Sequence, residues 1–327
     1  MPKSLKAVIA DFKGKKVIVW GDYILDEYIF TTSARVSREA PVLVTEWEGS
    51  DYRLGGAGNV VMNLVSLGAD PLPVGFIGKD VQGRRLKAIF KRNGIPTGHL
   101  IEMGNFHTAI KSRVLSGGEN TRKQQVLRID SIHRSEIRMS AYAETESILS
   151  ELLASSDGLI MSDYLAQSVN AAVFGSLRKK FDRPLFALDS RNHLLDFPRV
   201  TVATPNEPEI KAIFPGNRFF TEDDFLAAGK ELLKRLQAEG LVMKRGHQGM
   251  IVFKRGRSPE KIEIHGTTDI VDVTGAGDTV LAVVSLSFIS GASLLDSARL
   301  ANIAAGMVVM KEGASPVLLD EFVHAVV

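Results

Sequence analysis

The strongest constraint on the fold is an alternation of short apolar runs with helical patterns. KVIVWG at residues 16–21, DGLIMSD at 157–163 and LFALD at 185–189 are apolar runs of strand length. Helical patterns separate such runs, for example at 54–69. Strands that alternate with helices predict a parallel sheet covered on both faces, with right-handed crossovers. We therefore expect an α/β fold with a mostly parallel central sheet.

Two segments interrupt this alternation. Residues 24–53 and 105–130 contain β-type patterns without a helix between them. They would combine into a small β-sheet lid over the cleft of the central sheet. The chain has 327 residues, 45% of them hydrophobic, which is enough for one large core. We expect a single domain over residues 1–327, with the lid as its appendage.

A glycine turn enters a long apolar helix within VDVTGAGDTVLAVVSLSF, residues 271–288. Gly275 and Gly277 flank Ala276, so the backbone can take positive φ and approach a ligand closely. Because the turn opens a helix, its free N–H groups and the helix dipole favour an anion such as a phosphoryl group. Asp278 lies in the first helical turn, where a general base and a plain helix-capping acid are both consistent with the pattern.

Polar residues beside the other predicted strands are candidate sugar ligands. Asp22 follows the strand 16–21 at its C-terminal end, where ligands bind in open α/β sheets; a solvated loop acid is the alternative. Gly55 and Gly56 permit close backbone approach, and Asn59 offers a donor and an acceptor beside them. A ligand-binding turn and tight helix packing both fit this second glycine turn.

Asn206 and Glu209 lie one helical turn apart, directly after the apolar run TVATP. An amide and a carboxylate on the same helix face can hold Mg²⁺ through water beside nucleotide phosphates. An ordinary capped helix start explains the same pair.

Taken together, these motifs resemble the ribokinase-like (PfkB) carbohydrate kinases over nearly the whole chain. The resemblance implies ATP as donor, Asp278 as catalytic base and the 275–277 turn as the anion hole. It also implies Mg²⁺ near Asn206 and Glu209, and a K⁺-type cation near Asp272 and Thr274. The remaining nucleotide contacts implied by it are Lys244, Gly246, Gly249 and Asn302. Lys244 stands where many relatives have Thr, and a helix-surface amide is the plainer account of Asn302.

A narrower resemblance concerns the kinases that phosphorylate O1 of D-glycero-β-D-manno-heptose 7-phosphate. This chain departs from the pattern of those kinases at two places. It has Ser190-Arg191 where they have Pro-Lys, and it has Leu165, Ala166 and Gln167 where they have Ala-Lys-Gly. In many bacteria that kinase is fused to a nucleotidyltransferase, and this chain, which ends without one, is similar to the stand-alone form. The segments that carry the resemblance are WGDYILDEY (20–28, which includes Asp26), RVSREAPVLV (35–44), GGAGNVVMNLVSLGA (55–69), TAIKSRVLS (108–116), QQVLRID (124–130) and MSDY (161–164).

Basic residues favour a phosphorylated acceptor. Lys111 and Arg113 are two residues apart on a predicted strand, so both side chains point to one face. Arg191 can also meet a phosphate. Edge protection of the strand is the alternative. Other acceptors, such as fructose, another sugar phosphate or a nucleoside, stay open, as does a non-catalytic sugar-binding relative, although Asp278 counts against the latter.

Composition indicates which kinds of binding partner and which cellular compartment to expect. The net charge of +2 gives no support for nucleic-acid or membrane binding, and the chain has no cysteine. It shows no signal peptide and no apolar run long enough to span a bilayer, so we expect a cytoplasmic protein. Ile29, Val42, Val44 and Val114 would leave apolar lid edges in water. We therefore expect a homodimer formed through the lid.

Overall fold

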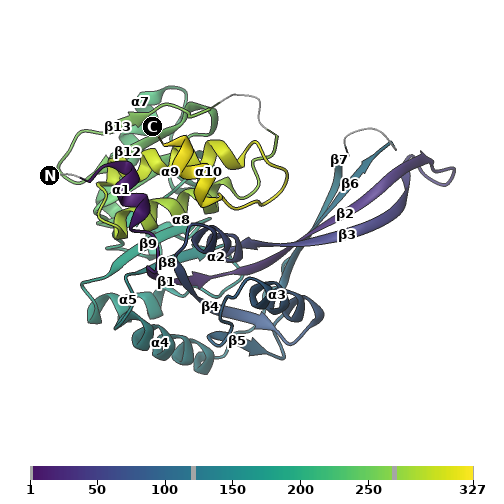
Figure 1. Cartoon of the computed structure of the whole chain (residues 1–327), viewed down its shortest axis with the longest axis horizontal. Coiled ribbons are helices and arrows are strands. Elements are labelled where there is room, and N and C mark those ends of the chain that lie inside the picture. The colour runs from purple at the N-terminus through teal and green to yellow at the C-terminus, as the bar shows by residue number, and fades with distance from the viewer. Residues whose placement is uncertain (1–2, 119–122, 267–270, 327) are drawn as a thin grey trace.

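A nine-stranded sheet forms the centre of the protein (Figure 1). The computed structural model describes residues 3–118, 123–266 and 271–326. Pairing is parallel from β5 to β11 and antiparallel at β12 and β13. In spatial order the strands are β13 (Glu260–Ile262), β12 (Met250–Lys254), β11 (Gly240–Lys244), β10 (Val202–Ala203), β9 (Leu185–Ser190), β8 (Gly158–Asp163), β1 (Lys16–Gly21), β4 (Asp70–Gly78) and β5 (Leu100–Met103).

The apolar runs form central strands because both faces of the sheet are buried. In β1, Val17 and Val19 point into one core, and Ile18 and Trp20 point into the other. All four side chains are fully buried. A strand enclosed on both sides needs apolar residues at successive positions, which is the pattern seen in its sequence.

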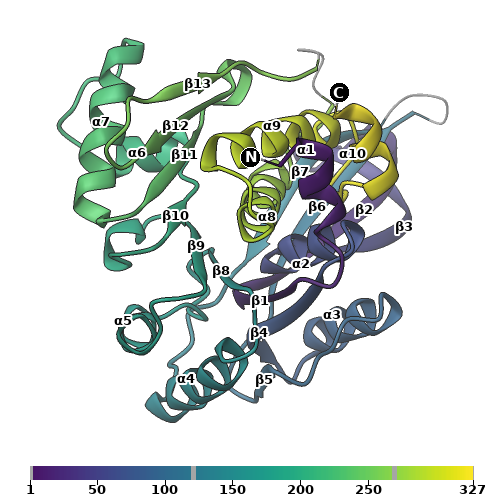
Figure 2. The same ribbon diagram turned by 60° about the vertical axis from the view of Figure 1, so that its left-hand side comes forward.

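Helices cover the two faces of this sheet, as Figure 2 shows. One layer packs against the core that contains Val17 and Val19, and the other packs against Ile18 and Trp20. The first layer comprises α1 (Leu5–Ala10), α2 (Ala57–Ser66), α3 (Val81–Arg92), α8 (Ala276–Ile289), α9 (Leu294–Val308) and α10 (Leu319–Ala325). The second comprises α4 (Met139–Leu153), α5 (Ala171–Lys180), α6 (Glu207–Ile213) and α7 (Glu222–Leu236).

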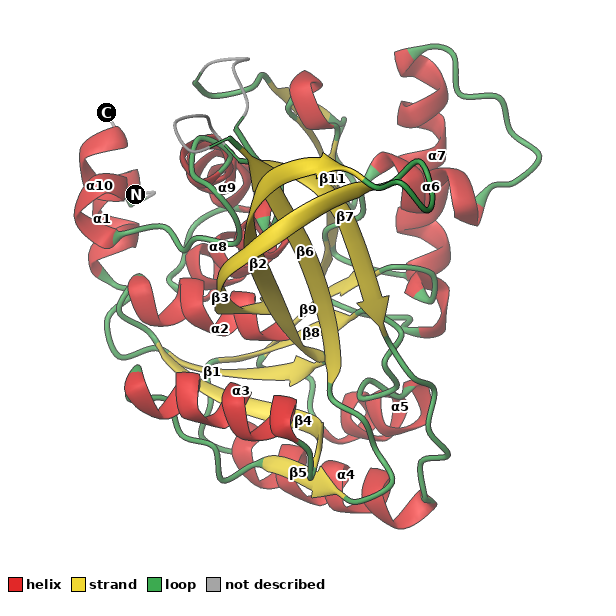
Figure 3. Ribbon diagram, turned by 90° about the vertical axis from the view of Figure 1, so that its right-hand side faces the viewer, coloured by secondary structure: helices red, strands yellow, loops and turns green. Residues whose placement is uncertain are grey.

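A second sheet of four strands projects from this body (Figures 1 and 3). We call it the lid sheet. The residues of β2 are buried where the strand leaves the body and exposed toward its far end. The expected fold class, a mostly parallel sheet between helices with a small additional β-sheet, is confirmed. In spatial order the lid sheet contains β3 (Leu43–Gly56), β2 (Tyr23–Val36), β6 (Ala109–Gly117) and β7 (Gln124–Ser131).

The lid strands run through the two segments that interrupt the alternation in the sequence. β2 and β3 occupy the first segment, and β6 and β7 lie in the second, of which residues 119–122 are outside the described residues. Within the described ranges, no helix has the length and apolar content needed to cross a membrane.

Candidate functional site

The glycine turn places Asp278 at the buried start of α8. Gly275 is the N-cap residue with φ of +83°, in the left-handed region that favours glycine. A Cβ at this position would collide with Nδ2 of Asn59. Asp278 is buried in the first helical turn, and α8 behind it is buried through Ser287. The expected anion hole and acid are thus one compact unit at a helix N-terminus.

Both carboxylate oxygens of Asp278 accept hydrogen bonds. Nδ2 of Asn59 donates to Oδ2 over 3.0 Å, and Oη of Tyr164 donates to Oδ1 over 2.8 Å. Burial raises the pKa of Asp278 to about 6, while the hydrogen bonds from Asn59 and Tyr164 act in the opposite direction. A carboxylate with this pKa is ionised at neutral pH and can still accept a proton.

Asp26 and Arg113 form a buried ion pair at the base of the lid sheet. Nη1 of Arg113 lies 2.6 Å from Oδ1 of Asp26. Asp26 also lies against the second glycine turn, since a Cβ on Gly55 would approach its Oδ2 to 2.5 Å. Gly56, with φ of +56°, then starts α2. The two glycines, Asp26 and Asn59 of α2 therefore lie near one another where the lid sheet meets the start of α2.

Lys111 is half-buried on the same face of the lid sheet as Arg113, as the spacing of two residues predicts. Its Nζ lies 4.9 Å from the centre of the Tyr164 ring. Burial lowers the pKa of Lys111, although the nearby Asp26 opposes this effect, and the positive charge of Arg191 lowers the pKa further. The exposed Arg191 is therefore close enough to Lys111 to contribute to the same positive field.

Asp22 has a role that differs from the sequence expectation. Its side chain is fully buried, and its carboxylate accepts backbone N–H bonds of 2.8 to 2.9 Å from Tyr164, Ala166 and Ser168. Burial raises the pKa of Asp22 to about 6, and these three bonds oppose the rise. With its oxygens enclosed by the 164–168 loop, Asp22 shapes that loop and does not offer an open acceptor to a sugar hydroxyl.

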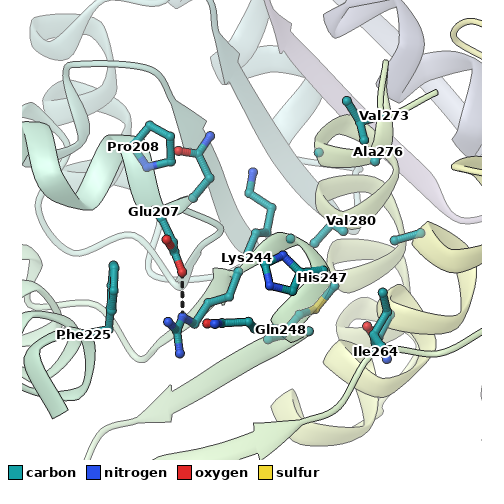
Figure 4. Close-up of a pocket in the computed structure, with 18 of the residues that line it drawn as sticks. Glu207, Pro208, Phe225, Lys244, His247, Gln248, Ile264, Val273, Ala276 and Val280 are labelled. Carbon is teal, nitrogen blue, oxygen red and sulfur yellow. Dashed lines mark hydrogen bonds and ion pairs between the residues drawn. The ribbon is translucent and has the colours of Figure 1, made fainter. Parts of the chain in front are cut away.

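The expected nucleotide residues line one cavity of about 720 Å³ beside the glycine turn. Figure 4 shows Lys244 in this cavity, between Glu207 and Pro208 on one side and Ala276 and Val280 on the other. The lining includes seven residues that the sequence predicted for nucleotide binding or for the glycine turn: Asn206, Lys244, Gly246, Gly249, Ala276, Gly277 and Asn302.

Asn206 and Glu209 form a capping box at the start of α6. Asn206 Oδ1 accepts from the backbone N–H of Glu209 over 2.9 Å, and the Glu209 carboxylate accepts from the backbone and the side chain of Asn206. Burial and the nearby Asp189 raise the pKa of Glu209 to about 7. Carboxylate oxygens retain further lone pairs, so the pair suits contact with Mg²⁺ through water. Among the described residues, no group of three or more acids and histidines is arranged to hold a metal directly.

Asp272 holds the loop expected to carry a monovalent cation. Its Oδ1 accepts from the N–H of Thr274 over 2.8 Å, and its Oδ2 accepts from the N–H of Gly313 over 3.0 Å. Burial would raise the pKa of Asp272, but these bonds and the charge of Arg113 lower it. The carboxylate is thus ionised, and it ties the turn before α8 to the loop after α9.

A second cavity, of about 680 Å³, lies between the lid sheet and the two loops that Asp272 joins, the one before α8 and the one after α9. Its lining includes Asp272 and three cationic side chains, those of Arg53, Arg113 and Lys123.

Sequence reasoning missed two residues of the site, Tyr164 and Asp189. Each lies at the C-terminal end of a parallel strand. Tyr164 directly follows β8, and Asp189 is the second-to-last residue of β9. The rule that drew attention to Asp22 applies equally to both positions. Their importance is visible only in three dimensions, where Tyr164 meets Asp278 and Asp189 meets Lys244.

The comparisons with known proteins agree with this geometry. Residues 15–320 match the model described as pfkB family carbohydrate kinase. The chain belongs to the pfkB family of carbohydrate kinases, so the expected enzyme class is confirmed.

Two similar curated proteins are bifunctional proteins named HldE. The chain is 32% identical to the bifunctional protein HldE of Pelobacter propionicus over 99% of its length, and 35% identical to that of Citrifermentans bemidjiense over 95%. It spans 66% and 63% of the length of these two relatives.

Solved structures share the fold at low sequence identity. Phosphofructokinase-2 of Escherichia coli in complex with potassium has a TM-score of 0.76 at 16% identity, covering 96% of this chain and 98% of its own. Ribokinase of Arabidopsis thaliana with ribose and ATP has a TM-score of 0.70 at 20% identity, covering 95% and 99%.

Proposed function

We propose that this chain is an ATP-dependent kinase that phosphorylates a hydroxyl of a phosphorylated sugar, with O1 of D-glycero-β-D-manno-heptose 7-phosphate as the favoured acceptor. The observation that carries the proposal is the buried, doubly hydrogen-bonded Asp278 beside a glycine turn and a large cavity. Similarity to the HldE proteins favours heptose 7-phosphate, although the chain covers only about two thirds of them.

In this mechanism Asp278 accepts the proton of the attacking hydroxyl. The oxygen of that hydroxyl bonds to the γ-phosphorus while the bond to ADP breaks. Backbone N–H groups from Gly275 to Asp278, at the positive end of α8, receive the charge that develops on the phosphoryl oxygens. Asn59 and Tyr164 hold the carboxylate toward the reacting hydroxyl.

The acceptor would lie between the lid sheet and the second glycine turn. Asp26, Gly55, Gly56 and Asn59 offer polar groups for its hydroxyls. Lys111, Arg113 and Arg191 would attract its phosphate, and the cationic lining of the second cavity adds to this field. Asp22 contributes by holding the loop that carries Tyr164.

ATP would occupy the cavity lined by Asn206, Lys244, Gly246, Gly249 and Asn302. Mg²⁺ bound there would neutralise phosphate charge, and Asn206 and Glu209 would hold it through water. Asp272 and Thr274 would form part of a K⁺ site, a proposal that the ionised Asp272 supports. The similar phosphofructokinase-2 was solved with potassium.

The lid sheet would exclude water from the reaction. It would also join two subunits into a homodimer. Each chain would work as a single domain in the cytoplasm, where ATP is supplied. Trp47 of β3 is 69% exposed and Val42, just before β3, is 56% exposed, while Ile29, Val44 and Val114 are half-buried. The apolar surface that supports the dimer therefore comes chiefly from exposed residues of β2, β3, β7 and the loop between β2 and β3, namely Val36, Val42, Leu43, Trp47, Val126, Leu127 and Ile129.

The test is a phosphoryl-transfer assay with ATP and a panel of acceptors. The panel contains heptose 7-phosphate, the same heptose without phosphate, fructose, fructose 6-phosphate and a nucleoside. Preference for heptose 7-phosphate supports the proposal. Equal kcat/KM for the two heptoses would remove the phosphorylated acceptor, and sugar binding without any transfer would favour a non-catalytic relative.

A further inference from the structure

Lys244 brings a positive charge to the glycine turn. Its Nζ lies 2.6 Å from Oδ2 of Asp189, and the lysine side chain is only 13% exposed. A Cβ built on Gly277 would lie 3.4 Å from the same Nζ. The ammonium group therefore lies directly against the turn whose N–H groups form the proposed anion hole.

The backbone of Lys244 is fixed in this position. Its N–H donates to the carbonyl of Pro205 over 2.8 Å, and the residue ends β11 opposite Asn206. Burial alone would lower the pKa of Lys244, but Asp189 and Glu209 outweigh burial and raise it. Lys244 is thus a charged group at neutral pH, held among carboxylates on a rigid strand end.

We propose that Lys244 is a catalytic residue that contacts an oxygen of the γ-phosphoryl group during transfer, moving from its resting partner Asp189. This inference rests on the proposed kinase function and deepens it. In the step, the acceptor oxygen bonds to the γ-phosphorus, and the bond to the bridging oxygen breaks with its electron pair going to ADP. The proton goes to Asp278, and Lys244 stays protonated throughout.

The charge arrangement supports a role in transfer. Asp189 Oδ2 lies 3.9 Å from the Cβ position of Gly277, so without a cation it would repel an incoming phosphate. Lys244 offsets that repulsion in a poorly solvated site, where a fixed positive group acts strongly on developing negative charge. The purely structural alternative is that the pair only ties β11 to β9 across β10.

The test compares Lys244→Met with Asp189→Asn and with the double variant that carries both changes. The double variant removes the ion pair without leaving Asp189 buried and unpaired, so it keeps the test valid if Lys244→Met fails to fold. Lys254→Met is the matched control, because Lys254 is exposed at the far end of the neighbouring strand β12. Calorimetry with ATP, ADP and adenosine accompanies the kinase assay.

We expect the double variant to have a kcat about 100-fold or more below that of Asp189→Asn, with KM for the acceptor little changed. Loss of Lys244 should weaken ATP binding about tenfold and leave ADP and adenosine binding little changed. If the double variant matches Asp189→Asn in kcat and in ATP affinity, the pair is structural and the proposal is overturned.

The nucleotide measurements keep this result separate from the proposed function. If the wild-type protein phosphorylates no acceptor in the panel, the proposed function fails. The comparison of ATP with ADP still decides whether Lys244 contacts the terminal phosphate, since it needs no acceptor.

Discussion

Oη of Tyr164 donates a 2.8 Å hydrogen bond to Oδ1 of Asp278. The backbone N–H of the same Tyr164 donates to Asp22. Tyr164, in the loop after β8, thus links the acid at the end of β1 to the acid at the start of α8, with one hydrogen bond from its backbone and one from its side chain. The orientation of the proposed base depends on a loop that is remote from it in sequence.

Tyr164→Phe should change the pH profile of the enzyme. Asp278 acts as a base only when ionised, so kcat/KM should fall as the pH decreases below its pKa of about 6. The Tyr164 hydroxyl stabilises the ionised form, and its removal raises the pKa of Asp278. We therefore expect the acidic limb of the kcat/KM profile to move to higher pH.

Tyr52→Phe is the control for this change, because Tyr52 donates to Glu27 in the lid sheet. Its profile should match that of the wild type. An unchanged acidic limb in Tyr164→Phe would show that this hydrogen bond does not tune the base.

Asp278→Asn should abolish phosphoryl transfer while preserving nucleotide binding. The amide has the same shape but cannot take the proton, so we expect kcat to fall by about 10²- to 10⁴-fold. Circular dichroism and ATP calorimetry would establish that the variant is folded and binds the donor. A kcat near that of the wild type would rule out Asp278 as the base.

Asp22→Asn should loosen the 164–168 loop. An amide has one accepting oxygen, so at least one of the three N–H donors now served by Asp22 loses its partner. Each unsatisfied buried donor costs about 1–3 kcal/mol. We expect a lower Tm and slower transfer, measured by calorimetry and by the kinase assay. Wild-type values of both would show that the loop does not depend on this carboxylate.

Sequence patterns were informative wherever one local rule was sufficient. Continuous apolar runs identified the central strands, and the glycines at 275 and 277 identified the turn before α8. Asp22 was misjudged because its position at a strand end says nothing about which backbone donors surround it. The Lys244–Asp189 contact joins strands separated by another strand, so no spacing in the sequence reveals it.

Lys111→Met should weaken binding of a phosphorylated acceptor. Lys111 contacts the Tyr164 ring and has the exposure to meet a ligand, so its removal should raise KM about tenfold for that acceptor. KM for the unphosphorylated sugar should stay the same. Equal effects on both substrates would mean that Lys111 does not recognise the phosphate.

Arg113→Ala should act differently, by destabilising the protein. It leaves Asp26 buried without its cation, which costs about 3–5 kcal/mol. Urea unfolding measures this loss, and any rise in KM for the phosphorylated acceptor must be compared with it. A stability equal to that of the wild type would show that Asp26 finds another partner.

The lid sheet should hold a homodimer together. Light scattering of the wild type at micromolar concentration should give twice the 35.6 kDa chain mass. Replacing the exposed Leu43 and Trp47 with Glu should give monomers, because each change places a charge in an apolar contact. A wild-type protein that is monomeric under these conditions would contradict the proposal.

Because β2 and β3 are long, a small rotation at the base of the lid sheet would move its far end a long way. Each strand runs for 14 residues. Such a strand is about 46 Å long, so a rotation of about 10° at its base moves its far end by about 8 Å. The pivot includes Asp26 and Arg113, which belong to the proposed acceptor site. If a bound sugar rotated the lid sheet about this base, a second subunit, or a fluorescent label near Trp47, would register the displacement.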